Sequence, residues 1–217
     1  MTPQEAIDRS LALTCWSGAV TAQPLAGGIA NHNILVCDAG NQDVVRLGQD
    51  IPHHMIMRRN ELGISRAAHS AGVSPKVVHA EPAVMVSEYI DSTSLVAEDL
   101  QDPVTLAAVV DLIKQAHVTL PAHLRGPVLS FWVFHILRDY AATLRDRGSP
   151  HNGQLVTLLQ QAATLKQAVG PVEMVLGHND LLPANILRAI PLCLIWAGWP
   201  VIVRCRAIMK QSCCSAI

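Results

Sequence analysis

The chain of 217 residues has few aromatic side chains, few charges and almost no charge imbalance. Phe, Trp and Tyr together make up 4% of the residues, and charged residues make up 15%. The 16 basic and 17 acidic residues give a formal net charge of -1, and no basic run occurs. Because nucleic-acid binding depends on positive charge that neutralises phosphates, we expect no nucleic-acid partner.

The sequence also lacks an apolar run long enough to cross a bilayer, and we expect no leader. The apolar stretch at 189–203 is shorter than the ~20 residues of a membrane-spanning helix and contains two prolines. The first 14 residues carry acids where a signal peptide would have a basic patch before an apolar run. We therefore expect no membrane span and a cytoplasmic location.

Paired cysteine motifs are absent. Of the six cysteines, Cys15 and Cys37 stand alone, and the other four lie within the last 25 residues without the CxxC spacing of zinc sites. In a cytoplasmic protein this distribution predicts reduced thiols without a role. A metal or redox site is the alternative.

The chain is half hydrophobic, and its periodicity changes near residue 90. Alternating runs and turn residues come first, and helical spacing follows. The expected elements are a helix at 3–14, strands at 19–26, 33–38 and 43–48, a helix at 54–71, strands at 76–80 and 83–90, and helices at 103–120, 129–148 and 153–169. A sheet followed by helices favours two lobes. We expect a nucleotide-binding N-lobe at 1–90, a helical C-lobe at 91–187 and an aberrant tail at 188–217.

The segment VLGHNDLLPANIL, residues 175–187, contains an Asp and an Asn five positions apart, Asp180 and Asn185. Pro183 keeps the segment from continuing as a helix. An Asp can accept the proton of an attacking hydroxyl, and an Asn amide oxygen can bind a metal beside the same hydroxyl. This division of roles is typical of phosphoryl transfer.

The segment resembles the catalytic loop of the choline/ethanolamine kinases and the related aminoglycoside phosphotransferases, with the pattern H-x-D-x-x-x-x-N. Four earlier segments match the family in order: LAGGIANHNILV its glycine loop, VVRL its third strand, RRNE its N-lobe helix and VMVSEYI its hinge. The resemblance covers about residues 20–187. It implies an α+β, two-lobed protein-kinase-like fold with an antiparallel-sheet N-lobe and a mostly helical, incomplete C-lobe.

The resemblance assigns three roles in the loop. Asp180 would be the general base, His178 would orient the loop, and Asn185 would hold a magnesium ion. The alternative for Asp180 and Asn185 is an Asx pair that only shapes a turn.

Further positions would bind the nucleotide ATP. Gly27 and Gly28 would let the backbone approach the phosphates, and Asn31 would help to fix the turn. Arg46 would chelate phosphate oxygens, and Glu61 would be its ion-pair partner. Alone, the glycines could form a plain hairpin turn and the two charges could be solvated surface residues.

The hinge, including Glu88 and Tyr89, would offer backbone groups to adenine. The implied reaction is ATP- and Mg²⁺-dependent phosphorylation of a hydroxyl on a small amino alcohol, choline or ethanolamine first. An aminoglycoside or another small hydroxylated amine is the alternative substrate. Phe131 and Trp132 are candidates to contact a substrate ammonium, or else they are core residues. The oligomeric state is open.

The resemblance breaks after Asn185. The family continues into a segment such as I-D-W-E-Y-A-G, whose Asp binds the second metal, but residues 186–217 contain no Asp or Glu. The tail is either divergent or translated in the wrong frame. Shifted codons from Leu192 onward can read L-F-D-L-G-x-L-A-G-N, which resembles the family's next segment. A non-catalytic nucleotide-binding pseudokinase or an inactive truncated product is therefore the alternative function.

Overall fold

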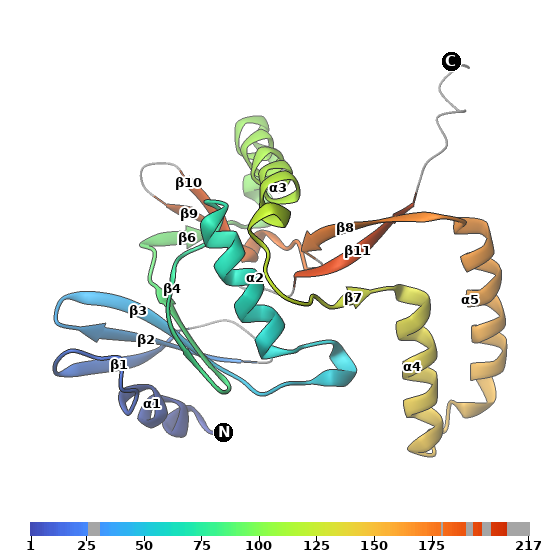
Figure 1. Ribbon diagram of the computed structural model, residues 1–217, viewed down its shortest axis with the longest axis horizontal. Helices are drawn as coiled ribbons and strands as arrows, with labels where there is room; N and C mark the ends of the chain where they lie inside the picture. The colour runs from blue at the N-terminus through green and yellow to red at the C-terminus, as the bar shows by residue number, and fades with distance from the viewer. Residues whose placement is uncertain (26–30, 179, 190–192, 197–200, 208–217) are drawn as a thin grey trace.

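The computed structural model describes residues 1–25, 31–178, 180–189, 193–196 and 201–207. Its first part is a five-stranded antiparallel sheet with the strand order β1-β2-β3-β5-β4 (Figure 1). The strands are β1 (Val20–Leu25), β2 (His32–Asp38), β3 (Asn41–Leu47), β4 (Val77–Glu81) and β5 (Val84–Glu88). The α+β class expected from the sequence is confirmed.

Helix α1 (Pro3–Leu11) covers one face of this sheet. It begins with a capping box, in which the Thr2 hydroxyl accepts from the Glu5 N–H and the Glu5 carboxylate accepts from the Thr2 N–H. Apolar residues of the helix and the strands form a buried cluster: Ala6, Leu13, Ile34, Val36, Val45, Leu47, Val84 and Val86. Alternate residues of the strands thus point into this core, as their period of two requires.

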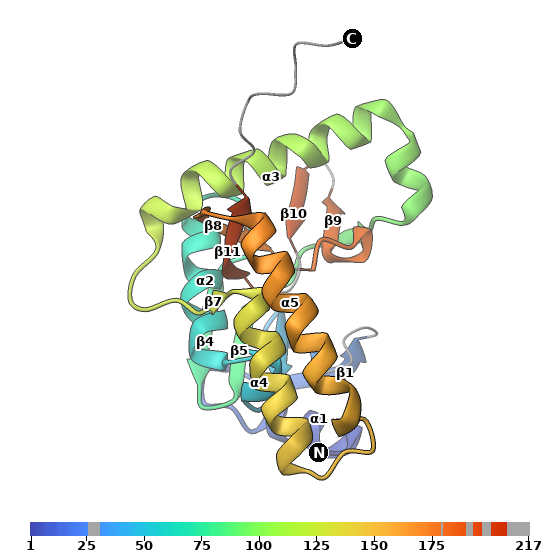
Figure 2. The same cartoon turned by 90° about the vertical axis from the view of Figure 1, so that its right-hand side faces the viewer.

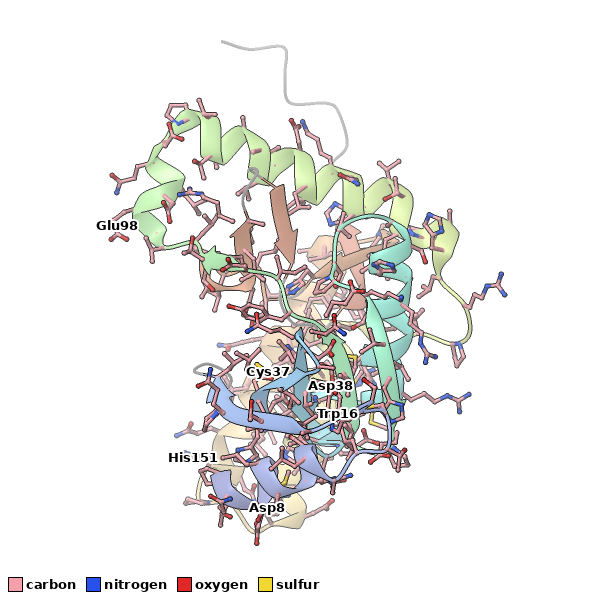
Figure 3. The ribbon with its side chains drawn as sticks, turned by 90° about the vertical axis from the view of Figure 1, so that its left-hand side faces the viewer. Asp8, Trp16, Cys37, Asp38, Glu98 and His151 are labelled. Carbon is pink, nitrogen blue, oxygen red and sulfur yellow. The ribbon has the colours of Figure 1, made fainter. Side chains whose placement is uncertain are left out.

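The β2–β3 hairpin turns through two residues with positive φ, Ala39 at 48° and Gly40 at 91°. Asp38, just before the turn, accepts hydrogen bonds from the Ser17 N–H and hydroxyl and from the Gly18 N–H. The Ser17 backbone hydrogen bond is the largest cause that lowers the pKa of Asp38. Figure 3 shows Asp38 next to Trp16, so this carboxylate joins the sheet to the segment that leaves α1.

Helix α2 (Arg58–Ser70) begins later than the start at residue 54 that the sequence predicted. Instead, Pro52–His54 forms a short 3-10 turn, η1, and Met55 adopts a left-handed conformation with φ 59°. Ile51 and Ile56 pair as an isolated bridge across this turn. Because a left-handed residue cannot continue a right-handed helix, the two segments cannot merge.

The later helices are α3 (Pro103–His123), α4 (Val133–Asp146) and α5 (Leu155–Val169). The Asp102 side chain caps α3 by accepting from the Thr105 N–H. Of the short elements, β6 (Ser92–Ser94) and η2 (Ala97–Gln101) precede α3, β7 (Ser130–Phe131) lies between α3 and α4, and η3 (Asn152–Gln154) lies between α4 and α5. Figure 2 shows α4 and α5 as an antiparallel pair, and Figure 1 shows that the pair stands apart from the sheet.

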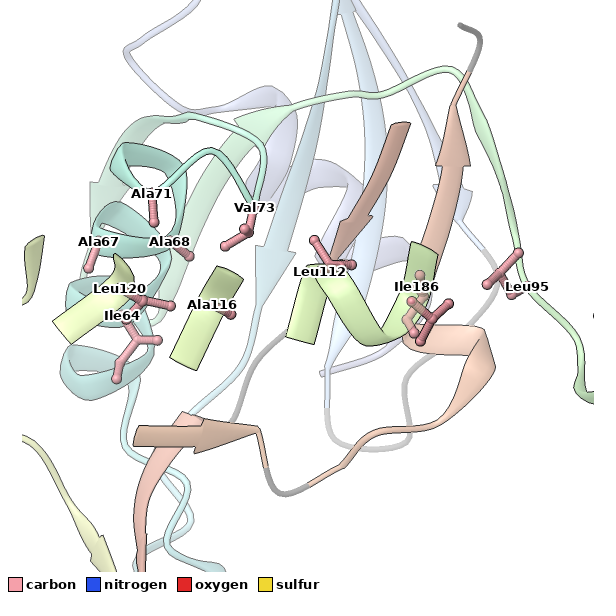
Figure 4. Packing of buried hydrophobic residues seen from close by; sticks show 11 residues of the cluster. Ile64, Ala67, Ala68, Ala71, Val73, Leu95, Leu112, Ala116, Leu120 and Ile186 are labelled. Carbon is pink, nitrogen blue, oxygen red and sulfur yellow. The ribbon is translucent and has the colours of Figure 1, made fainter. Parts of the chain in front are cut away.

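A second core cluster joins α2 to later parts of the chain (Figure 4). Its buried members are Ile64, Ala67, Ala68, Ala71, Val73, Leu95, Val109, Leu112, Ala116, Leu120 and Ile186. Helix α2 therefore packs against α3, across the expected boundary at residues 90 and 91. The division into lobes stays a prediction.

Four strands follow α5, and the sequence patterns did not predict them. They are β8 (Val172–His178), β9 (Ile186–Ala189), β10 (Cys193–Trp196) and β11 (Val201–Ala207), with the 3-10 turn η4 (Pro183–Asn185) before β9. β10 pairs with β9, and β11 pairs with β8, both antiparallel. The described backbone of the tail is therefore joined to the rest of the chain. Within the described residues, no helix is both long and apolar enough to cross a bilayer.

Candidate active site

The loop between β8 and β9 is fixed at both ends by buried residues. His178, the last residue of β8, is buried, and its Nδ1 accepts from the Asp180 N–H at 3.1 Å. Ile186, the first residue of β9, belongs to the core, and its carbonyl accepts from the Leu95 N–H at 2.9 Å. Between these ends, Asp180 is exposed and Asn185 is half-buried.

Asp180 and Asn185 contact each other within this loop. The Asn185 amide nitrogen, Nδ2, donates to the Asp180 carbonyl at 2.9 Å and to its carboxylate Oδ2 at 3.1 Å. The 3-10 turn η4 brings them together, and the Asn185 N–H donates to the Leu182 carbonyl. With Nδ2 directed at Asp180, no hydrogen bond among the described residues engages Asn185 Oδ1. That oxygen is open to a ligand.

Arg46 on β3 and Glu61 on α2 form an ion pair, with Arg46 Nη1 2.6 Å from Glu61 Oε1. Glu61 is only 5% exposed. Its second oxygen, Oε2, binds Arg58 Nη1, also at 2.6 Å. The sequence predicted the pairing of Arg46 with Glu61 but missed Arg58, although its i, i+3 spacing from Glu61 on a helix is a signal for such a contact.

Asn31 lies beside the same network. Its Oδ1 and the Arg58 Nη2 are each 2.5 Å from the position that a Cβ would occupy at Gly48. A side chain at Gly48 would therefore collide with both groups. The buried Asn31 Oδ1 has no hydrogen-bond partner among the described residues. Gly27 and Gly28, the glycines of the expected glycine loop, lie outside the described residues.

The hinge groups lie at the end of β5. The Glu88 N–H donates to the Lys76 carbonyl, and the Tyr89 N–H donates to the Gln42 carbonyl. The sequence predicted that backbone groups of residues 88–90 face adenine, and two of these N–H groups are thus used within the fold. The N–H of the next residue, Ile90, has no acceptor in the described part of the chain. It is the hinge donor still open to a ligand.

A cavity of about 230 Å³ lies between α2 and the β4–β5 hairpin. Arg46, Arg58 and Glu61 line one side of it, and Pro82 and Met85 belong to its apolar side. Solvent in this cavity can therefore reach the two ion pairs from the side of the β4–β5 hairpin. Among the described residues, no group of three or more His, Cys, Asp or Glu side chains could hold a metal by itself.

The candidate substrate aromatics lie apart from these groups in sequence and pack locally. The Trp132 ring lies edge-on to Phe134, with 5.0 Å between the ring centroids. Phe131 is part of β7, which pairs with the backbone of β11. Both residues are half-buried. Their role in binding an ammonium group stays a prediction.

A five-stranded antiparallel sheet, a helix whose acid binds an arginine of the third strand, and an Asp–Asn loop after a buried His define a chain of protein-kinase-like fold. The family model described as choline/ethanolamine kinase matches residues 22–198. The chain belongs to this family of small-molecule kinases.

Solved structures of the family share the fold. An ethanolamine kinase of Plasmodium vivax aligns with a TM-score of 0.68 at 18% identity, covering 85% of this chain and 57% of that one. A choline/ethanolamine kinase family protein of Mesorhizobium loti aligns with a TM-score of 0.66 at 24% identity, covering 94% and 67%. The choline kinase LicA of Streptococcus pneumoniae gives 0.60 at 19%, covering 90% and 66%.

The chain thus spans 57% to 67% of the length of these three solved relatives. No curated protein sequence matches it.

Proposed function

We propose that the chain is built for phosphoryl transfer from ATP to the hydroxyl of a small amino alcohol, with choline or ethanolamine as the first candidates. The observation that carries the proposal is the contact between Asp180 and Asn185 on a loop anchored by buried His178. This arrangement leaves one exposed carboxylate and one open amide oxygen side by side, as phosphoryl transfer requires.

In the proposed reaction, the substrate hydroxyl oxygen attacks the γ-phosphorus of ATP. The bond from that phosphorus to the bridging oxygen breaks, and ADP leaves. The Asp180 carboxylate accepts the hydroxyl proton. Arg46 holds phosphate oxygens, and its position is fixed by Glu61. The Ile90 N–H and other backbone groups of the hinge face the adenine.

The donor set fits magnesium as an ion that arrives with the nucleotide. Magnesium usually takes one or two protein oxygen ligands and completes its shell with phosphates and waters. Asn185 Oδ1 would be such a ligand. When bound, Mg²⁺ would neutralise charge on the phosphates. Among similar structures, one of LicA is described as a complex with AMP and one of a spectinomycin phosphotransferase as a complex with ADP, which supports a nucleotide site here.

A second function, nucleotide binding without turnover, is favoured by the composition of the tail. Residues 186–217 contain no Asp or Glu, so they offer no carboxylate for a second metal. Asn185 is a neutral ligand and cannot replace one. If two metals are needed to balance the charge of the transferred group, the chain would bind nucleotide but react slowly or not at all.

Two measurements on the purified chain separate these functions. The first is thermal unfolding with and without ATP and Mg²⁺. Nucleotide at a hundredfold excess over its Kd should stabilise the fold by about 2.7 kcal/mol. Arg46→Ala should reduce this stabilisation, whereas Arg66→Ala, at an exposed position of α2, should leave it unchanged. No stabilisation by nucleotide would exclude both functions.

The second measurement is ADP formation with choline, ethanolamine or an aminoglycoside. Asp180→Asn should lower the rate by about 100-fold or more, because it removes the proton acceptor and keeps the shape. Asp139→Asn on α4 is the matched control and should have no effect. Near-normal turnover with Asn at position 180 would contradict the proposed mechanism. Nucleotide binding with no turnover of any substrate would favour the second function.

A further inference from the structure

The cavity between α2 and the β4–β5 hairpin lies on the face of the sheet opposite α1. Helix α2 packs against β4 (Figure 1). Arg46 of β3 pairs with Met85 of β5, and Met85 pairs with Ala80 of β4, so these three side chains form a row on one face. Val45 and Val84, next to Arg46 and Met85, are buried on the other face with α1. The row is therefore one wall of the cavity, and the first turn of α2 is the other.

The α2 side of the cavity carries more positive than negative charge. Arg46 and Arg58 share the single carboxylate of Glu61, and the two arginine side chains are 18% and 15% exposed. Because a guanidinium stays protonated, two cations and one anion give this group a formal charge of +1. Charge that is partly removed from water favours a counter-ion nearby.

Arg59, the next residue of α2, adds a further positive charge to the lining of the cavity. It is exposed, and it makes no hydrogen bond or ion pair with any other residue that the structure describes. The acid on the hairpin side is Glu81, whose side chain is 39% exposed and lies 3.8 Å from His79. Three arginines and two acids thus surround the cavity, and the balance favours an anion.

The rest of the lining is apolar. It consists of Leu62 of α2 and of Ala80, Pro82, Ala83, Val84 and Met85 of the hairpin. The volume of about 230 Å³ is below the ~300–1,000 Å³ of sites for drug-sized ligands. A ligand that fits both sides of the cavity is therefore compact, with an apolar body and one anionic end.

We propose that this cavity binds a small organic oxyanion, either a carboxylate or a phosphate monoester, on a compact apolar body. The oxyanion accepts hydrogen bonds from Arg59 and from Arg46, since Arg46 uses only Nη1 of its five N–H donors' nitrogens toward Glu61. The apolar body packs against Met85 and Ala80. Glu88 at the hinge is four residues beyond Val84 on β5, about 13 Å at ~3.3 Å per residue, so the cavity is separate from the adenine end of the proposed nucleotide site.

Titration of the full chain with benzoate at constant ionic strength, followed by ligand-observed NMR, tests the proposal. Benzoate has one carboxylate on a compact ring, and benzamide is its uncharged counterpart. Benzoate should bind with a dissociation constant of about 1 mM or lower, and benzamide should bind at least about fivefold more weakly. Phenyl phosphate, titrated in the same way, distinguishes a phosphate site from a carboxylate site. No binding of either anion, or equal binding of benzamide, would overturn the proposal.

Two variants locate the bound anion. Arg59→Ala should weaken benzoate binding by about fivefold or more, and Arg66→Ala, at an exposed position of α2 outside the lining, is the matched control and should not change it. Ala80→Leu should fill the cavity and block benzoate, while thermal unfolding occurs at an equal or higher temperature. Circular dichroism confirms that each variant is folded. Benzoate binding that survives either Arg59→Ala or Ala80→Leu would place the anion elsewhere and overturn the proposal.

Nucleotide binding is measured separately, because Arg46 belongs to the proposed nucleotide site as well as to the cavity. Arg59 belongs to the cavity alone, so Arg59→Ala should leave the thermal stabilisation by ATP and Mg²⁺ unchanged. If this variant lost both benzoate and nucleotide binding, the cavity would be part of the nucleotide site, and the proposal would fail. A chain that binds benzoate but no nucleotide would contradict the proposed function and support the anion site.

Discussion

Glu61→Ala is the change that should disturb the candidate site most, because one carboxylate holds two guanidinium groups. Glu61 is 5% exposed and lies 2.6 Å from both Arg46 and Arg58, whose side chains are 18% and 15% exposed. Removing the acid leaves two cations near each other in a site with little water. Removing either arginine leaves the acid with one partner.

The expected costs follow from this asymmetry. Breaking a buried ion pair by removing one partner costs ~3–5 kcal/mol. Since both arginines keep some contact with solvent, we expect about 3 kcal/mol of unfolding free energy for Glu61→Ala. Arg46→Ala and Arg58→Ala should each cost about 1.5–2 kcal/mol, the lower part of the range for one hydrogen bond to a charged group.

Urea unfolding of the single and double variants, followed by circular dichroism, measures these costs. Arg46→Ala and Glu61→Ala should combine non-additively, with a coupling energy above about 1 kcal/mol, and the same cycle should appear in nucleotide binding. Glu81→Ala removes an exposed acid that also lines the cavity and should cost less than about 0.5 kcal/mol. The reasoning fails if Glu61→Ala costs no more than this control, or if the cycle is strictly additive.

Three further changes test the sheet by urea or acid unfolding. Burial, followed by the charges of Glu88 and Asp38, raises the pKa of Asp43, so its ionisation destabilises the fold as pH rises. Asp43→Asn should therefore stabilise the fold by roughly 0.5 kcal/mol at neutral pH and have little effect in acid. The Ser17 backbone hydrogen bond lowers the pKa of Asp38, so the ionised carboxylate stabilises the fold at pH values above its unfolded-state pKa. The Asp38→Asn variant should be less stable than the unchanged chain at neutral pH. This difference should vanish as the pH falls through the folded-state pKa of Asp38. Ala83 has φ 65° in the β4–β5 turn, so Ala83→Gly should stabilise by roughly 0.5–1 kcal/mol, and a loss of stability would contradict the turn.

The regular part of the fold was predictable from local patterns. The β2–β3 hairpin followed from the Ala39-Gly40-Asn41 turn, and Thr2 before Pro3 indicated the start of α1. The start of α2 was wrong by four residues, because nothing in the helical spacing shows that Met55 takes a left-handed conformation. Strands β8, β9 and β11 were missed since they pair with distant segments, β8 with β11 and β9 with β6, which leaves no short-range signal; β10 pairs with the adjacent β9.

The candidate site was predictable only where residue type and order were specific. The spacing of Asp180 and Asn185 indicated two groups that act beside one hydroxyl but not their direct hydrogen bond, and the order of segments indicated the pair of Arg46 and Glu61. Arg58 was missed because a charged residue on a helix surface is more often solvated, and its burial depends on β3 and the loop after it. The Glu88 and Tyr89 N–H groups donate to carbonyls of neighbouring segments instead of remaining open to a ligand. These hydrogen bonds depend on strand register, which composition does not specify.

The two halves of the candidate site share one packed core, and this bears on both proposed functions. Helix α2 carries Glu61 and contributes Ile64 to the cluster, while Ile186, directly after Asn185, packs in the same cluster. Because close-packed interiors resist displacement, the Arg46–Glu61 ion pair and the loop are positioned by a single unit. That positioning needs no carboxylate after Asn185. The geometry of the proposed nucleotide site is therefore independent of whether the chain transfers phosphate, and binding and turnover must be measured separately.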